Sequence, residues 1–145
     1  MTSPREVRDA LYDLVDGSTI TANGSTIVLS AIKCIPLKGQ FKSYPVVAIE
    51  WVGGPVENLL RSTQIIKDDF NILITHKYAV TSEAEDTVMD ICSAIEVIID
   101  ANPTLSSTVE FAYVTGRSKV QDLVDGDYRV VSFKLRISSK RYEGV

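Results

Sequence analysis

The chain has 145 residues, a length typical of a single domain, and a domain of this size can bury a core without a metal or a disulfide. Apolar residues make up 45% of it and charged residues 23%, as in an ordinary soluble globular protein. The 15 Lys and Arg residues are outnumbered by 19 Asp and Glu residues. The resulting net charge of −4 excludes a strongly basic nucleic-acid-binding chain, although it leaves room for a local basic face.

The few cysteines and histidines, together with the short apolar runs, exclude further classes. Two Cys and one His are too few for a disulfide framework or a zinc cluster, so Cys34 and Cys92 are expected to be buried, reduced thiols. The longest apolar runs, residues 46–49 and 97–99, are far shorter than the about 20 residues that cross a bilayer. Because the N-terminus also lacks a basic start before an apolar core, we expect no signal peptide, no membrane contact and folding in a reducing cytosol.

The first predicted element is a helix over residues 4–16. Ser3 is a good N-cap, Pro4 suits the first helical position, and Glu6 completes a Ser-x-x-Glu capping box. Gly17 is the residue type that commonly ends a helix. The face expected to meet the core consists of Val7, Ala10, Leu11, Leu14 and Val15.

An extended region follows this helix. Residues 18–22 and 25–35 are rich in Thr, Ile and Val, and the Asn23-Gly24 dipeptide between them is the strongest short-range signal for a type I′ hairpin turn. Residues 37–45 are then predicted to form an irregular loop, and residues 46–52 a strand.

The second half of the chain continues this mixture of strands and a helix. After an ambiguous segment at 56–60, the predicted elements are a strand over residues 61–80 that is interrupted at 67–69, a helix over 81–101, a strand over 109–115, a polar loop over 117–126 and a strand over 128–138. The tail, residues 139–145, is charged and without a pattern, and we expect it to be mobile. No repeat or linker divides residues 1–145, so the chain is predicted to be one α+β domain with one mainly antiparallel β-sheet packed against two α-helices.

No group of residues predicts catalysis, a metal or a cofactor. His76 is the only histidine, and nothing in the spacing places Cys34 beside it as a nucleophile. The acidic clusters at 68–69, 83–86 and 122–127 fit a turn, a helix start and a loop, and none matches a Ca²⁺-binding loop. We therefore expect no enzyme activity and no cofactor.

Basic residues gather in the last strand and the tail, at Lys134, Arg136, Lys140 and Arg141. They predict a basic edge of the sheet. Two interpretations remain open, a solvated sheet face and a contact with an acidic partner surface.

Large aromatic side chains lie in the predicted loop before the strand at 46–52. Phe41 and Tyr44 are accompanied there by Lys38 and Lys42. The loop either folds back onto its own core or contacts another subunit, because aromatic residues are enriched in interface cores.

The order of elements resembles the tail-terminator (tail-completion) proteins of long-tailed bacteriophages and related tailed viruses. The resemblance rests on architecture and on no catalytic fingerprint. The segments that carry it are the helix at 4–16 with its Val-x-x-Ala-Leu-x-x-Leu pattern, the Pro-containing stretch 35–50 that leads into a Val-rich strand, the strand at 69–78, the helix that opens with Ala84-Glu85-Asp86 and ends near Asn102-Pro103, and the strand at 128–137.

This resemblance implies a structural virion protein that is assembled in the host cytoplasm and located in the tail or neck. Such a protein forms a homomeric ring, commonly a hexamer, that caps the tail tube protein, stops its polymerisation and offers a joining surface to a head-completion or neck protein. Genomic DNA passes through the ring without sequence-specific binding, and we expect acidic side chains to line that passage. The residues expected to contact subunits or the tube are Lys38, Phe41, Lys42, Tyr44, Leu59, Leu60 and Arg61.

Three other functions remain open. Another head–tail connector or neck protein would have a similar outline. A small α+β enzyme or ligand-binding domain would require a concave pocket where polar groups converge. A nucleic-acid-binding adaptor would use the basic residues 134–141 and show strongly salt-dependent binding.

Overall fold

The computed structural model describes residues 2–33, 45–60, 63–77, 81–125 and 128–144. Two helices and nine strands occur in this part of the chain. In chain order they are α1 (Pro4–Val15), β1 (Thr19–Ala22), β2 (Ser25–Val28), β3 (Ser30–Ile32), β4 (Val46–Trp51), β5 (Val56–Leu60), β6 (Thr63–Lys77), α2 (Thr81–Ala101), β7 (Phe111–Arg117), β8 (Gln121–Asp125) and β9 (Tyr128–Gly144). The predicted α+β class is confirmed.

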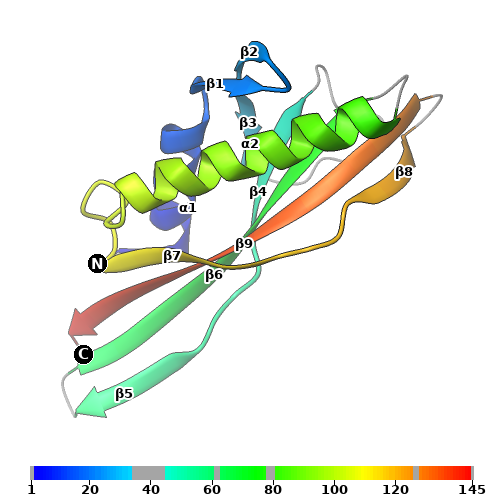
Figure 1. The fold of residues 1–145 in the computed structure, drawn as a ribbon. Coiled ribbons are helices and arrows are strands. Elements are labelled where there is room, and N and C mark those ends of the chain that lie inside the picture. Colours follow the sequence, from blue (N-terminus) through cyan, green and yellow to red (C-terminus); the bar gives the residue numbers. More distant parts are fainter. Residues whose placement is uncertain (1, 34–44, 61–62, 78–80, 126–127, 145) are drawn as a thin grey trace.

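Seven strands form one sheet, whose main path runs β3-β4-β6-β9-β7, with β5 also paired to β6 and β8 to β9. Every pair in it is antiparallel except β3 with β4. The two longest strands, β6 and β9, pair along the whole length of β6 and form the centre of the sheet (Figure 1). At one end β5, the start of β6 and the end of β9 extend away from the helices.

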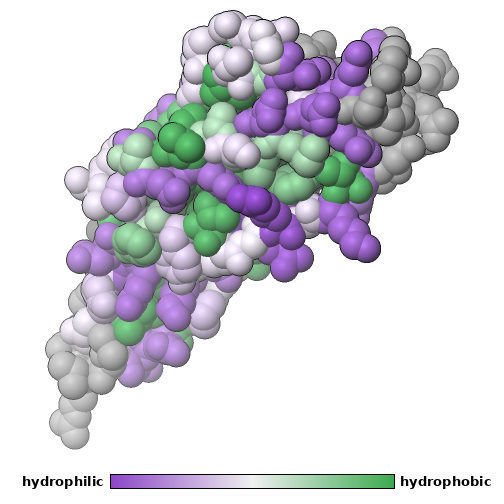
Figure 2. Space-filling model, viewed as in Figure 1, coloured by the Kyte–Doolittle hydropathy of each residue, from purple (hydrophilic) through white to green (hydrophobic). Residues whose placement is uncertain are grey.

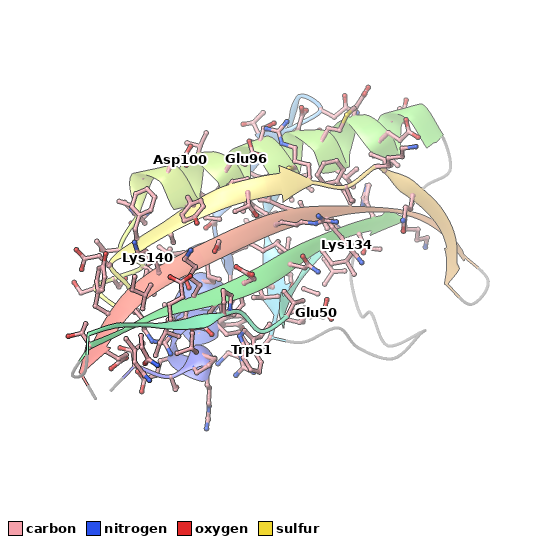
Figure 3. The ribbon with its side chains drawn as sticks, turned by 90° about the horizontal axis from the view of Figure 1, so that it is seen from below. Glu50, Trp51, Glu96, Asp100, Lys134 and Lys140 are labelled. Atoms are coloured by element: carbon pink, nitrogen blue, oxygen red, sulfur yellow. The ribbon has the colours of Figure 1, made fainter. Side chains whose placement is uncertain are left out.

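Both helices cover the same face of this sheet, and Figure 3 shows the opposite face with the helices behind it. The core lies between these two layers. It includes Phe70, Ile72 and Ile74 of β6, Phe133, Leu135 and Ile137 of β9, Val88, Ile91, Ile95 and Ile99 of α2, and Val7, Leu11 and Val15 of α1. We call the other side of the sheet, which no helix covers among the described residues, the open face.

Local signals in the sequence placed the first elements correctly. The Ser3 side chain accepts a hydrogen bond from the Glu6 amide, as the predicted cap requires. Strands β1 and β2 form a separate two-stranded hairpin, in which Asn23 and Gly24 have φ values of 48° and 77°. Two successive positive φ values are the signature of a type I′ turn, so the predicted hairpin is confirmed.

The predicted strand boundaries were wrong at four places. Strand β6 is continuous through residues 67–69, because all three residues pair with β9. The predicted loop at 117–126 contains β8, and the single strand predicted over 25–35 is divided into β2 and β3. Strand β9 continues to Gly144, so residues 139–144 form a central strand rather than a tail without structure.

Neither helix in the described part of the chain is long and apolar enough to cross a membrane.

Candidate functional site

Most of the residues predicted at a subunit or tube contact cannot be placed. Lys38, Phe41, Lys42, Tyr44 and Arg61 lie outside the described residues. Leu59 and Leu60 belong to β5, which is paired on one side with β6. The structure therefore neither joins these residues into one surface nor separates them.

The predicted basic edge is not an edge. Strand β9 lies inside the sheet, between β6 on one side and β7 and β8 on the other. Side chains of a strand alternate between its two faces, so Lys134, Arg136 and Lys140 lie on the open face whereas Arg141 lies on the helix side. Figure 3 labels Lys134 and Lys140 on this face. Arg141 is only 6% exposed and so does not belong to a solvated basic patch.

Aromatic side chains lie beside the basic ones on the open face. Lys140 pairs across the sheet with Phe111 of β7 on one side and with Lys67 of β6 on the other. The Lys140 Nζ atom lies 5.2 Å from the centre of the Tyr142 ring, a cation–π distance. The rings of Phe111 and Tyr113 are 5.4 Å apart. We call this set of seven residues the basic–aromatic face; its members are Lys67, Phe111, Tyr113, Lys134, Arg136, Lys140 and Tyr142.

An open depression of about 550 Å³ lies on the same side of the sheet. Lys67, Tyr113 and Arg136 from the basic–aromatic face contribute to its lining, together with Asn71 and Ser138. Acidic residues are fewer here, with Asp69 in the depression and Glu50 opposite Asn71 in the register. The surface is therefore locally cationic on a chain that is acidic as a whole.

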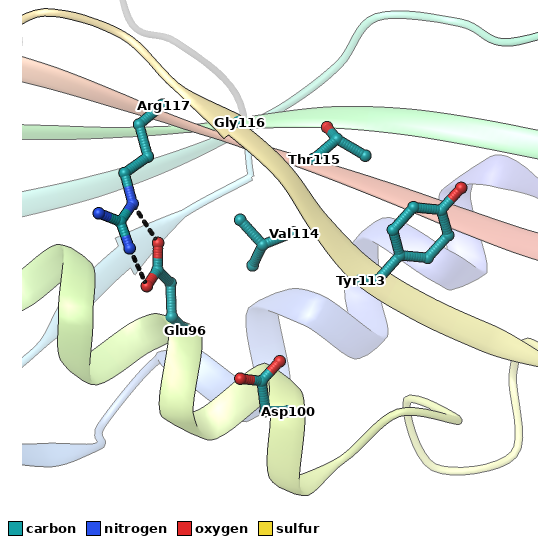
Figure 4. A pocket seen from close by; sticks show the side chains of 7 residues that line it. All are labelled: Glu96, Asp100, Tyr113, Val114, Thr115, Gly116 and Arg117. Atoms are coloured by element: carbon teal, nitrogen blue, oxygen red, sulfur yellow. Dashed lines mark hydrogen bonds and ion pairs between the residues drawn. The ribbon is translucent and has the colours of Figure 1, made fainter.

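A second depression, of about 590 Å³, lies between α2 and the edge strand β7 (Figure 4). Arg117 donates two hydrogen bonds of 2.6 Å to the two carboxylate oxygens of Glu96. The hydrogen bonds to Glu96 raise the pKa of Arg117 above its ordinary value. The positive charge of Arg117 and the negative charge of Glu96 therefore compensate each other. Asp100 is the remaining charged residue of the lining.

A buried ionic network joins three strands on the helix side of the sheet. Asp68 is 3% exposed and forms a salt bridge with Arg141. Asp68 also accepts a hydrogen bond of 3.1 Å from the Trp51 indole nitrogen, and Arg141 donates one of 3.2 Å to Glu143. The backbone nitrogen of Thr2 donates to the same Glu143 oxygen at 3.2 Å, so the network also holds the segment before α1.

Sequence reasoning missed this network because its partners are about 70 positions apart. Asp68 was interpreted as part of a turn, and Arg141 as part of a basic edge that either faces solvent or contacts an acidic partner. A charge-bearing residue at an apolar position of an alternating strand is the signal that could have indicated a buried pair.

His76, the one candidate base, lies at the end of β6 and is half-buried. Its Nδ1 atom is buried and has no hydrogen-bond partner among the described residues. No group of three or more His, Cys, Asp and Glu side chains in that part of the chain could hold a metal ion.

Burial lowers the pKa of His76 below its ordinary value of 6.5. The unfolded chain therefore binds the proton more readily, and the contribution of His76 to stability falls as the pH is lowered through 6.5. We expect the wild type to lose more free energy of unfolding than His76→Gln between pH 7.5 and pH 5.5, as measured by urea denaturation. Equal losses in the two proteins would contradict this assignment.

Cys92 is a buried thiol of α2, with 2% of its surface exposed. Desolvation, with a smaller contribution from the nearby Glu96 carboxylate, raises its pKa to about 11. In a Cys34→Ser variant at pH 8, we expect Cys92 to react with a thiol reagent about a hundredfold more slowly than in the urea-unfolded chain, because the thiolate is the reactive form. Rapid labelling of the folded variant would show that the thiol is accessible.

No protein-family model matches this sequence, and no curated protein is similar to it.

Proposed function

We propose that this chain is a non-enzymatic structural virion protein, a tail terminator that forms a homomeric ring on the end of a tail tube. In this role it stops polymerisation of the tube protein and provides the surface to which a head-completion or neck protein joins. The proposal combines the order of elements, which resembles tail terminators, with the surfaces of the described residues.

The observation that supports it most is the uncovered side of the central sheet. The open face carries half-exposed aromatic rings and several cations, and the described residues leave it without a covering layer. Strands β5 and β7 also lie at opposite edges of the sheet, and within the described part of the chain each is paired on one side only. Such edges and faces are templates for another chain, and ring closure is one way to satisfy them without leaving a growing end.

Particle mass measured against concentration by light scattering, with negative-stain images of the same samples, tests the ring. We expect a closed particle with a central hole, and purified tubes should stop growing when the protein is added. A protein that neither closes into a ring alone nor binds tube ends would overturn the proposal. A ring that leaves tube growth unchanged would instead favour another neck component.

A second candidate, a nucleic-acid-binding adaptor, is favoured by the basic–aromatic face. Aromatic rings beside Lys and Arg side chains stack on exposed bases and contact phosphates. Binding of a single-stranded oligonucleotide that weakens steeply with salt and is lost in Lys134→Glu/Arg136→Glu would support this function. No binding at low salt would remove it.

A further inference from the structure

Charge is segregated between the two sides of the molecule. Helix α2 contains six acidic residues and neither Lys nor Arg. Six of its solvent-exposed positions recur every three or four residues, as expected for one helical face; they are Glu83, Asp86, Asp90, Ser93, Val97 and Asp100. We call the four carboxylates among them the acidic stripe.

Exposed apolar side chains lie on the same helical face as the acidic stripe. Val97 lies between its carboxylates and is 67% exposed, and Met89 lies next to Asp90 in the sequence and is 45% exposed. Figure 2 shows hydrophilic residues along this side of the molecule with apolar residues between them. On a helix face with this composition, the apolar side chains can be buried against a partner, and the carboxylates favour a partner that is positively charged.

The basic–aromatic face has the opposite composition and lies on the opposite side of the sheet. Its cations are Lys67, Lys134, Arg136 and Lys140, and its apolar contribution includes Phe111, which is 50% exposed, and Tyr142, which is 48% exposed. The two sides of the molecule are therefore complementary. Each carries the charge opposite to that of the other, and each has apolar side chains that could cover those exposed on the other.

We propose that the acidic stripe of α2 in one copy of the chain docks on the basic–aromatic face of the next copy. This inference rests on the proposed homomeric assembly and specifies which surfaces form it. The sheet would then have helices on both faces, which is the arrangement that buries a two-sided sheet most completely. A helix of 21 residues is roughly 31 Å long at 1.5 Å per residue, and β9, with 17 residues at about 3.3 Å each, is long enough to receive it.

The charges favour this arrangement over two others. A symmetric contact between two basic–aromatic faces would bring four cations against four cations. Binding of a polyanion would use the same face but leave the acidic stripe without a role. A contact between two different faces is heterologous, so each added copy exposes one unoccupied face to the next copy. Such an assembly closes into a ring where the rotation between neighbouring copies permits.

Charge reversal within one chain tests this docking. One variant carries Lys134→Glu and Arg136→Glu, a second carries Asp86→Lys and Asp100→Lys, and a third carries all four substitutions. Asp90 is left unchanged because its carboxylate accepts a hydrogen bond of 2.7 Å from the Asn23 amide. Arg5→Glu/Lys119→Glu is the matched control, since both residues are exposed and lie outside the two surfaces.

We expect each two-residue reversal to raise the concentration at half-assembly by about tenfold or more at low salt. The four-substitution chain, in which both charges are exchanged, should assemble within about threefold of the wild type, since the pairing is restored. The control should assemble as the wild type does. Circular dichroism and urea denaturation of each variant separate loss of docking from loss of folding.

Three results would overturn this inference. A wild-type ring that none of the reversals affects would place the contact elsewhere while leaving the tail-terminator proposal standing. Failure of the four-substitution chain to regain assembly would show that the two surfaces do not meet. A wild type that stays monomeric at every concentration, with Lys134→Glu/Arg136→Glu changing only the binding of an oligonucleotide, would assign the basic–aromatic face to another partner. Tube capping is measured separately and judges the terminator proposal by itself.

Discussion

Replacing Arg141 with methionine is expected to lower the free energy of unfolding by about 3–5 kcal/mol, because removing one partner of a buried ion pair leaves the other charge unpaired. Asp68 is as buried as Arg141. Without the Arg141 guanidinium, the carboxylates of Asp68 and Glu143 both lose their ion-pair partner. Urea denaturation at pH 7 measures the loss. The variant keeps the length and apolar stem of the side chain, so the effect reports mainly the charge.

Lys140→Met provides the matched control, since Lys140 is the preceding residue on the same strand and lies on the open face. Its loss should change stability by about 0.5 kcal/mol or less, as for a surface substitution. The double variant Asp68→Leu/Arg141→Met should recover much of the stability lost in Arg141→Met, because both charges then leave the interior together. A cost below about 1 kcal/mol for Arg141→Met would mean that water reaches the pair and screens it.

The helices and the hairpin were predictable because their signals are local. A capping residue, a 3.6-residue apolar period and an Asn-Gly turn act over at most a few neighbouring residues. Apolar and polar residues alternate in 128–138, a pattern that is typical of a strand with Lys134 and Arg136 on the face opposite Phe133 and Leu135, and the structure has them there.

The strand order was not predictable in the same way. Whether β9 lies at an edge or in the centre depends on its pairing with β6, and that pairing joins residues such as Thr63 and Gly144. Residues 139–144 look like a solvated tail because five of the six are charged or carry a hydroxyl group. In the structure, however, the partner strand satisfies their backbone, and the buried carboxylate of Asp68 pairs with Arg141. Long-range pairing overrides local composition here.

The candidate surfaces could be predicted only in part. The basic residues were found, but the aromatic residues that lie beside them come from β7 and from the predicted tail, at Phe111, Tyr113 and Tyr142. The acidic stripe was visible in the sequence, since residues 81–101 contain no base, and it was interpreted only as favourable charge at a helix start. That the acidic stripe and the basic–aromatic face lie on opposite sides of the sheet depends on how the helix and sheet layers pack. The sequence pattern of α2 alone does not show it.

Gly54→Ala is expected to destabilise the protein by about 3 kcal/mol, through a steric clash that no flexible side chain can relieve. A Cβ atom at this position would lie 1.8 Å from the backbone oxygen of Lys67. Gly54 is where the chain crosses from β4 to β5 beside β6, and two hydrogen bonds hold it there. The Asp69 amide donates to the Gly53 oxygen at 2.7 Å, and the Lys67 amide donates to the Pro55 oxygen at 3.0 Å.

Gly53→Ala is the control that separates this close approach from backbone strain. Gly53 has a φ of +84°, and a Cβ atom there would meet nothing within 4 Å, so its replacement should cost only the about 1–2 kcal/mol of a left-handed alanine. Urea denaturation compares the two variants, and hydrogen exchange at Val56–Leu60 locates the damage. Because the clash pushes the chain away from β6, these amides should exchange faster in Gly54→Ala than in Gly53→Ala. Equal stability and equal exchange in the two variants would mean that β5 is held against β6 by contacts other than the crossing at Gly54.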